Sequence, residues 1–204
     1  MSSIVAVTEV DARDARRNIS AFCLRTPLVR FNWQAPPGHP GEGTEIFLKL
    51  ENLQPAVNSF KLRGAGNAIA HLSESDLQGG LVTASAGNMA QGLAANAKRL
   101  GCPCTTVVPD HAPRSKLEAT ERLGCRIIKV PFEEWWKILE TSDCPQVKGH
   151  FIHPVLDQRV VIGNSTRKSI PASNYLTKCA PLTGMHIPQL HWRCSRTCPK
   201  SMLS

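Results

Sequence analysis

The chain has 204 residues, of which 42% are apolar and 20% are charged, and its formal net charge is +8. This composition is typical of globular proteins and excludes a collagen, a coiled coil and a wholly disordered chain. No apolar run is long enough to span a bilayer, and the amino terminus lacks the pattern of a signal peptide, so we expect a cytoplasmic protein with reduced cysteines.

The positive charge is concentrated in the last part of the chain. Residues 1–166 hold 18 Lys/Arg against 16 Asp/Glu, a net charge of +2, whereas residues 167–204 hold six Lys/Arg and no acid, a net charge of +6. The final segment also lacks apolar periodicity, and we expect a disordered basic tail outside the folded part. Nucleic acid is not an expected partner, because aromatic residues are sparse in the tail and no binding motif is present.

The first quarter of the chain predicts one helix and two strands. Thr8 can cap a helix that runs to about Ile19, with acidic residues in its first turn, where the helix dipole favours them. Extended runs at 26–31 and 45–51 flank a segment rich in Pro and Gly, 34–44, which should be an exposed loop.

From residue 59 onward, helix and strand patterns alternate. The expected helices lie at 59–72, 88–100, 114–123 and 132–140, and the expected strands at 80–85, 104–109 and 126–130. Alternation at this spacing is typical of right-handed crossover connections and predicts an α/β fold with a largely parallel sheet. Apolar runs such as Val107-Val108 suit strands that helices cover on both faces.

Lys61 lies just inside the expected start of the helix at 59–72, in the segment Asn58-Ser59-Phe60-Lys61-Leu62-Arg63-Gly64-Ala65. A lysine amine is a good nucleophile only when its pKa is lowered or when it is committed to an imine. The positive end of a helix dipole disfavours the ammonium form, so this position suits such a lysine. On this segment alone, a solvated lysine on a helix surface is the simpler interpretation.

A second segment, Ser85-Ala86-Gly87-Asn88-Met89-Ala90-Gln91-Gly92, joins the end of an expected strand to the start of a helix. Small residues at such a junction expose backbone N–H groups to an anion, and sites in open α/β sheets usually lie at this end of the strands. Taken alone, the segment could be an ordinary tight turn. Its glycine spacing is not that of a dinucleotide-binding loop.

In this order and separation, the two segments resemble the fold-type II pyridoxal-phosphate enzymes, the tryptophan synthase beta-like superfamily, and most of all the serine/threonine dehydratase and serine racemase branch. Further segments extend the resemblance over roughly residues 20–166: Arg25-Thr26-Pro27-Leu28, the run 48–55, Pro113-Arg114-Ser115-Lys116, His153-Pro154 and Arg159-Val160. The sulfhydrylase branch typically has a different lysine motif and is the less similar relative.

The resemblance implies a site for pyridoxal 5'-phosphate. Lys61 would bind the cofactor covalently and remove the α-proton of the substrate, Phe60 would pack against the pyridine ring, and Asn88 would hydrogen-bond the phenolic oxygen. The cradle for the substrate carboxylate would consist of Ser85, Ala86 and Gly87. The implied activity is that of a lyase of amino-acid metabolism: β-elimination of water from L-serine or L-threonine, giving a 2-oxo acid and ammonia.

Two positions refine this expectation. Ala86 cannot transfer a proton, whereas serine racemases of the branch typically have a second serine there, so dehydration is favoured over racemisation. Met89 stands where the family usually has histidine, and a thioether offers no comparable hydrogen-bond donor. We therefore expect substrate positioning to differ from that in ordinary threonine dehydratases.

The resemblance also implies a division into domains. We expect an amino-terminal part of the large domain at 1–52, an intact small αβα domain at 53–155, the start of a return to an incomplete large domain at 156–166, and a basic tail unrelated to the family at 167–204. The family's phosphate-gripping glycine-rich loop is missing, so we expect a truncated chain, possible as a homodimer, with weak or no dehydratase activity. The alternative is a non-catalytic remnant or interaction protein that retains the small domain.

The tail contains a loose zinc-like pattern of four residues, His186, His191, Cys194 and Cys198. No domain signature accompanies the pattern, and we interpret it as a chance cluster, so no metal site is expected.

Overall fold

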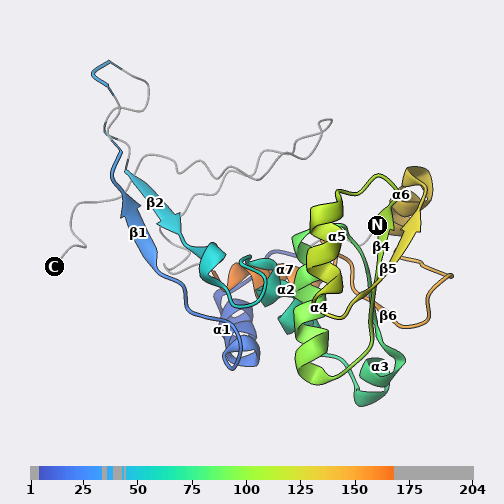
Figure 1. Ribbon diagram of the computed structural model, residues 1–204. Coiled ribbons are helices and arrows are strands. Elements are labelled where there is room, and N and C mark those ends of the chain that lie inside the picture. The colour runs from blue at the N-terminus through green and yellow to red at the C-terminus, as the bar shows by residue number, and fades with distance from the viewer. Residues whose placement is uncertain (1–4, 34–35, 39–42, 44, 168–204) are drawn as a thin grey trace. The chain divides into compact units, whose positions relative to one another are not determined.

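The computed structural model describes residues 5–33, 36–38, 43 and 45–167 (Figure 1). The contacts within the described chain divide it into two units. Unit 1 combines residues 5–26 with Leu50–Arg167, and unit 2 covers Pro27–Lys49. The expected division into domains at residues 52 and 155 stays a prediction, and the expected tail lies, from residue 168 on, outside the described residues.

Unit 1 is built on a four-stranded parallel sheet with the strand order β5-β4-β3-β6. The strands are β3 (Leu81–Ala84), β4 (Cys104–Pro109), β5 (Arg126–Val130) and β6 (His150–Phe151). All four residues of β3 are buried, as expected for a strand in a parallel sheet that helices cover on both faces. The predicted α/β fold with a largely parallel sheet is confirmed.

Seven α-helices and one short 3-10 helix are described in unit 1. They are α1 (Glu9–Ile19), η1 (Glu51–Leu53), α2 (Lys61–Ile69), α3 (Glu74–Gly79), α4 (Asn88–Leu100), α5 (Arg114–Glu121), α6 (Phe132–Thr141) and α7 (Gln158–Ser165). Local signals set several of these ends: Thr8 begins α1 with a capping box, and Gly101 ends α4 in the left-handed conformation. Among the described residues, no helix has the length and apolar character needed to cross a membrane.

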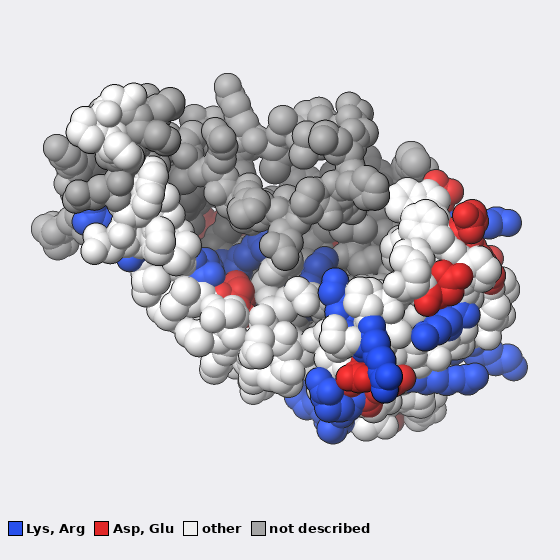
Figure 2. All heavy atoms as spheres, turned by 45° about the horizontal axis from the view of Figure 1, so that its top comes forward, with Lys and Arg blue, Asp and Glu red and all other residues white. Residues whose placement is uncertain are grey.

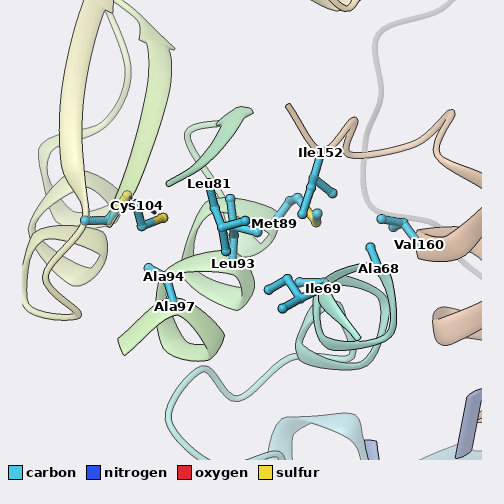
Figure 3. Packing of buried hydrophobic residues seen from close by; sticks show 12 residues of the cluster. Ala68, Ile69, Leu81, Met89, Leu93, Ala94, Ala97, Cys104, Ile152 and Val160 are labelled. Atoms are coloured by element: carbon cyan, nitrogen blue, oxygen red, sulfur yellow. Dashed lines mark hydrogen bonds between the residues drawn. The ribbon is translucent and has the colours of Figure 1, made fainter. Parts of the chain in front are cut away.

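The core of unit 1 lies on both faces of the sheet, because successive strand side chains point in opposite directions. Leu81 of β3 faces α2 and α4 in the main cluster, whereas Val82 faces α6 in a second cluster. Figure 3 shows the main cluster, in which Leu93 and Ile152 are fully buried. Met89 is 2% exposed and belongs to this cluster, so its thioether packs in the core.

Helix α2 approaches two other helices closely because glycines lie at the contacts. A Cβ atom added to Gly163 of α7 would lie 2.6 Å from the carbonyl oxygen of Arg63. A Cβ added to Gly92 of α4 would lie 2.9 Å from the carbonyl carbon of Lys61. Any larger residue would push these backbones apart, so the glycines fix how the start of α2 is held.

Unit 2 contains an antiparallel pair of strands, β1 (Leu28–Phe31) and β2 (Ile46–Lys49), in which Leu28 pairs with Lys49. The two expected extended runs are confirmed within shorter bounds. Several large apolar side chains of the pair are exposed: Val29, Phe31, Phe47 and Leu48.

The surface of the described chain carries charges of both signs. On the face drawn in Figure 2, blue basic side chains and red acidic side chains lie next to each other. This mixture agrees with the near balance of acidic and basic residues in the first 166 residues.

Candidate active site

Two loops leave the sheet of unit 1 at the same edge. The segment 85–88 follows β3, and the segment 152–156 follows β6, which pairs with β3 in parallel. Beyond the end of β6, the N–H of Ile152 donates to the carbonyl of Val82 at 2.8 Å, and the hydroxyl of Thr83 donates to the carbonyl of Ile152 at 2.9 Å. Both loops therefore lie at the carboxyl ends of the strands, where α/β proteins usually place their sites.

Lys61 is the first residue of α2, and its side chain reaches the second of these loops. Its Nζ atom donates a hydrogen bond to the carbonyl oxygen of Pro154 at 2.8 Å. Burial lowers the pKa of Lys61 below its ordinary value of 10.5, and the positive charge of Arg167 lowers it further. The sequence placed this lysine correctly in the first turn of a helix, and burial is the largest cause that lowers its pKa.

The helix starts at Lys61 rather than at Ser59: Phe60 is already helical, but the backbone three and five residues before Lys61 is turned away from the helical conformation. Ala56 and Asn58 adopt positive φ angles of 66° and 49°. The Ser59 hydroxyl then accepts the N–H of Lys61 at 3.3 Å, in place of a side-chain cap from Phe60. These contacts hold the residue before Lys61 in a fixed position.

The aromatic ring of Phe60 lies beside two cations. The Nζ atom of Lys61 is 5.6 Å from the ring centroid, and the guanidinium carbon of Arg167 is 4.4 Å from it. Cations at such distances are attracted by the negative face of the ring. Phe60 thus offers an apolar surface next to the lysine amine, with a second positive charge close by.

A buried ion pair between Arg63 of α2 and Glu51 of η1 also holds the start of the helix. Arg63 donates to both oxygens of Glu51, at 2.8 and 3.0 Å, and the two side chains are only 4% and 12% exposed. Thr26 donates to the same carboxylate at 2.7 Å. Burial alone would raise the pKa of Glu51, but the hydrogen bonds from Arg63 and Thr26 lower it on balance, so the pair is charged at neutral pH.

The loop after β3 presents an uncapped helix start. Gly87 precedes α4 and provides no side-chain cap, and a Cβ added there would meet nothing within 4 Å. The Ser85 hydroxyl accepts the N–H of Gly87 at 3.2 Å, and Thr106 donates to the Ser85 carbonyl at 2.8 Å. The loop is thus held in shape, while no side chain caps the first N–H groups of the helix, the kind of groups that can bind an anion.

Helix α4 connects this loop to Lys61. Asn88, Gly92 and Asn96 are spaced four residues apart and therefore share one face of the helix. Gly92 lies against the backbone of Lys61, and Asn96 donates to the carbonyl of Leu62 at 3.3 Å. Asn88 is exposed and forms no side-chain hydrogen bond to any described residue, so its amide is available to a ligand on the side of α4 that faces the start of α2.

This set of groups fits pyridoxal phosphate. The half-buried Lys61 amine can bond to the aldehyde, the Phe60 ring can cover an aromatic face, and the Asn88 amide can meet a hydroxyl. Among residues 5–33, 36–38, 43 and 45–167, His, Cys, Asp and Glu side chains form no group of three that could hold a metal ion.

Sequence reasoning gave no role to three residues of the site. His153 and Pro154 entered it only as part of the family pattern, and a backbone carbonyl such as that of Pro154 leaves no direct signal in a sequence. The buried Arg63 was also overlooked, although an arginine two residues after the candidate lysine, on an otherwise apolar helix, is a signal that a buried partner exists.

Known proteins resemble the chain over most of its described length. Residues 19–166 match the family described as "Pyridoxal-phosphate dependent enzyme". The chain is 39% identical to an L-threonine ammonia-lyase of Thermotoga maritima over 166 residues, which cover 78% of this chain and 39% of that protein. It is 38% identical over 157 residues to "L-threonine dehydratase catabolic TdcB" of Staphylococcus aureus, covering 76% of this chain and 44% of that one.

Solved structures agree with the sequence matches. Serine racemase from Dictyostelium discoideum superposes with a TM-score of 0.62 at 33% identity, over 79% of this chain and 51% of that one. The processed form of a threonine deaminase from Solanum lycopersicum superposes with a TM-score of 0.59 at 31% identity, over 81% of this chain and 48% of that one. The chain thus spans about two fifths of the length of these curated relatives and about half of these solved chains.

Proposed function

Because the chain belongs to the pyridoxal-phosphate dependent enzymes of fold type II, in their serine/threonine dehydratase branch, we propose that its site serves β-elimination of water from L-serine or L-threonine. Hydrolysis of the dehydrated product gives a 2-oxo acid and ammonia. The single observation that carries the proposal is the half-buried Lys61 amine, whose pKa is lowered. The amine is held at the carboxyl ends of the strands, where the loop 85–88 also emerges.

Lys61 is proposed to hold the cofactor and to transfer the α-proton. The cofactor, when bound, withdraws electrons from the α-carbon and thereby makes its proton acidic. A lysine can accept that proton only as a neutral amine, and the lowered pKa raises the neutral fraction near physiological pH. The Pro154 carbonyl accepts a hydrogen bond from the amine and so fixes its direction.

The remaining roles are those that the family resemblance implies, and the positions of the residues support them. Phe60 provides the apolar surface against the cofactor ring, and Asn88 provides the amide for the phenolic oxygen. The segment of Ser85, Ala86 and Gly87 would bind the substrate carboxylate, supported by the positive end of the α4 dipole and by a helix start that no side chain caps.

Ala86 supports dehydration over racemisation. Racemisation needs an acid on the face of the substrate opposite the lysine, and a methyl group cannot donate a proton. β-Elimination needs proton removal on one face only. Both threonine-processing enzymes and serine racemases are among the relatives, so this proposal rests on the residue and not on the names.

Two further expectations belong to the proposal: that the protein acts in the cytoplasm, and that it forms a homodimer. The first comes from the amino-terminal pattern and the lack of a long apolar run, and the second from the family resemblance. Light scattering on the purified full chain, with and without pyridoxal phosphate, measures the mass of the assembly and tests the second.

Exchange of the α-proton tests the proposed function. The full chain is incubated with pyridoxal phosphate and L-threonine or L-serine in D2O, and NMR follows deuterium at the α-carbon together with the 2-oxo acid. General base catalysis should make exchange about 100-fold faster than in the Lys61→Arg variant with the same cofactor concentration. Equal exchange rates for the two proteins would contradict the proposal, because free cofactor would then account for all of it.

A further inference from the structure

His153 closes a turn next to the residue that accepts the lysine's hydrogen bond. The imidazole is buried, with 6% of the residue exposed. Its Nδ1 atom accepts the N–H groups of Val155 at 3.1 Å and Leu156 at 2.8 Å, and its Nε2 atom lies 3.0 Å from the carbonyl oxygen of Leu139 on α6. An Nδ1 that accepts two N–H groups carries no proton, so the hydrogen-bond network assigns the hydrogen to Nε2.

The turn sets the direction of the Pro154 carbonyl. That carbonyl and the Val155 N–H belong to the same peptide plane, and in a trans peptide they point in opposite directions. When His153 binds the Val155 N–H, the carbonyl must point away from the imidazole. It meets the Nζ atom of Lys61 at 2.8 Å.

We propose that His153 is a positioning residue for Lys61: its neutral imidazole fixes the 154–155 peptide plane and so directs the Pro154 carbonyl at the lysine amine. The role deepens the proposed function, because the amine it positions is the one proposed to hold the cofactor. His153 itself touches neither the amine nor a reacting atom through any hydrogen bond in the described chain.

The surroundings keep the imidazole neutral. Burial lowers the pKa of His153, and the charge of Lys61 on α2 lowers it too, whereas the Leu139 carbonyl of α6 and the Asp157 carboxylate at the start of α7 oppose this shift. Protonation would place a hydrogen on Nδ1 directly opposite two N–H donors. The two hydrogen bonds that close this turn therefore require a neutral His153 imidazole.

The test measures how the reactivity of Lys61 with acetic anhydride depends on pH. Acetylation by a limiting amount of reagent is quantified by mass spectrometry and normalised to the exposed Lys116. His153→Phe keeps a ring but removes both nitrogens. His153→Asn keeps an acceptor that can reach the N–H groups two and three residues ahead. Thr83→Val is the matched control, because it removes a buried hydrogen bond to the adjacent Ile152 and leaves the turn intact.

In His153→Phe the ammonium loses a well-directed acceptor while its burial remains, so the midpoint of the Lys61 profile should fall. The expected effect is about tenfold faster acetylation at a pH below both midpoints. His153→Asn should stay within about threefold of the wild type, since the Val155 N–H keeps its partner. An unchanged or raised midpoint in His153→Phe, or an equal fall in Thr83→Val, would overturn the proposal.

A measurement on the unmodified protein keeps the proposal testable if a variant does not fold. Long-range proton–nitrogen NMR spectra report which imidazole nitrogen carries the hydrogen. The Nε2–H form of His153 is expected at pH 7, and an Nδ1–H form would overturn the proposal.

Neither readout needs bound cofactor, so the two proposals can fail separately. If acetylation responds to His153 but pyridoxal phosphate is not captured at Lys61, the proposed function fails and the positioning role stands. If the cofactor is captured but acetylation ignores His153, the positioning role fails alone.

Discussion

Lys61 donates to a neutral carbonyl rather than to a carboxylate. A carboxylate partner would raise the pKa of the amine and keep it protonated, whereas the Pro154 carbonyl orients the amine without adding a negative charge. Burial and the charge of Arg167 can then lower the pKa. The Pro154 carbonyl thus orients the Lys61 amine, while burial and Arg167 favour its neutral, nucleophilic form.

Replacing Glu51 measures what the buried Arg63–Glu51 ion pair contributes to the free energy of unfolding. Removing one partner of such a pair leaves the other charge buried alone, so Glu51→Gln should lower the free energy of unfolding by about 3 kcal/mol at pH 7. Because the folded-state pKa of Glu51 is lowered, its contribution is present above the ordinary value of 4.5 and disappears as the pH falls below it. Urea unfolding at pH 7 and at pH 3.5 measures both effects.

The matched control is Glu118→Gln on α5. Glu118 also pairs with an arginine, Arg114, at 2.7 Å, but their side chains are 44% and 92% exposed. Its replacement should change the free energy of unfolding by less than about 1 kcal/mol at either pH. Equal effects of the two substitutions would show that burial does not govern the Glu51 pair.

At the scale of elements, the contact between α2 and α7 depends on Gly163. A Cβ there would meet the Arg63 carbonyl, the Asn67 Cβ and the Gly64 Cα, all closer than 3 Å. Backbone atoms cannot give way locally, so Gly163→Ala should lower the free energy of unfolding by about 2 kcal/mol. Gly79→Ala at the end of α3, where a Cβ meets nothing within 4 Å, should leave it unchanged or slightly higher. Denaturant unfolding of both variants checks the difference, and equal losses would contradict it.

Gly92 links the same packing to the site. A Cβ on Gly92 would press on the Lys61 carbonyl and on the Leu62 nitrogen, at 2.9 and 3.1 Å. We expect Gly92→Ala to reduce borohydride-trapped pyridoxal phosphate on Lys61 by about tenfold, in line with the sensitivity of such sites to small displacements. Gly163→Ala serves as the comparison, because it loosens α2 without touching the Lys61 backbone. Undiminished trapping in Gly92→Ala would show that this contact does not position the lysine.

Local signals made some elements predictable and left others hidden. The bounds of β4, β5 and α4 were predicted as the structure has them, because apolar runs and Gly101 mark them. Helix α3 was missed although Ser73 and Asp76 form a capping box, since six residues give no clear periodicity. β6 has two residues and is a strand only through its pairing with β3, which no local pattern shows.

The candidate site likewise has parts that the sequence indicates and parts that it does not. Lys61 and the segment 85–88 became candidates through their combined resemblance to a known family, because each segment alone also suits an ordinary helix lysine or a tight turn. The Pro154 carbonyl and the turn that His153 closes could not be predicted, because they depend on backbone directions and on a buried contact with α6.

At the scale of the whole molecule, the two units differ in how they cover apolar side chains. In unit 1, buried apolar side chains form two core clusters, whereas Phe31 and Phe47 of unit 2 are 47% and 48% exposed. The double substitution Phe31→Thr/Phe47→Thr keeps residues that favour strands but removes exposed aromatic area. We expect less self-association by light scattering and unchanged hydrogen exchange in β3 and α4. Faster exchange in those elements would show that unit 1 depends on the two rings.

The chain covers about two fifths of its curated relatives, so the property to test first is one that the described residues can show by themselves. Capture of the cofactor by Lys61 is that property. Capture needs the Lys61 amine, with its lowered pKa, and the loop that contains Pro154. Both lie in unit 1.

Borohydride reduction of the full chain mixed with pyridoxal phosphate, followed by peptide mass spectrometry, measures this capture directly. The account predicts a pyridoxyl group on Lys61, with little label on exposed lysines such as Lys116 and none at position 61 of a Lys61→Arg variant. A Lys61 that stays unmodified, or that is labelled no more than Lys116, would contradict it.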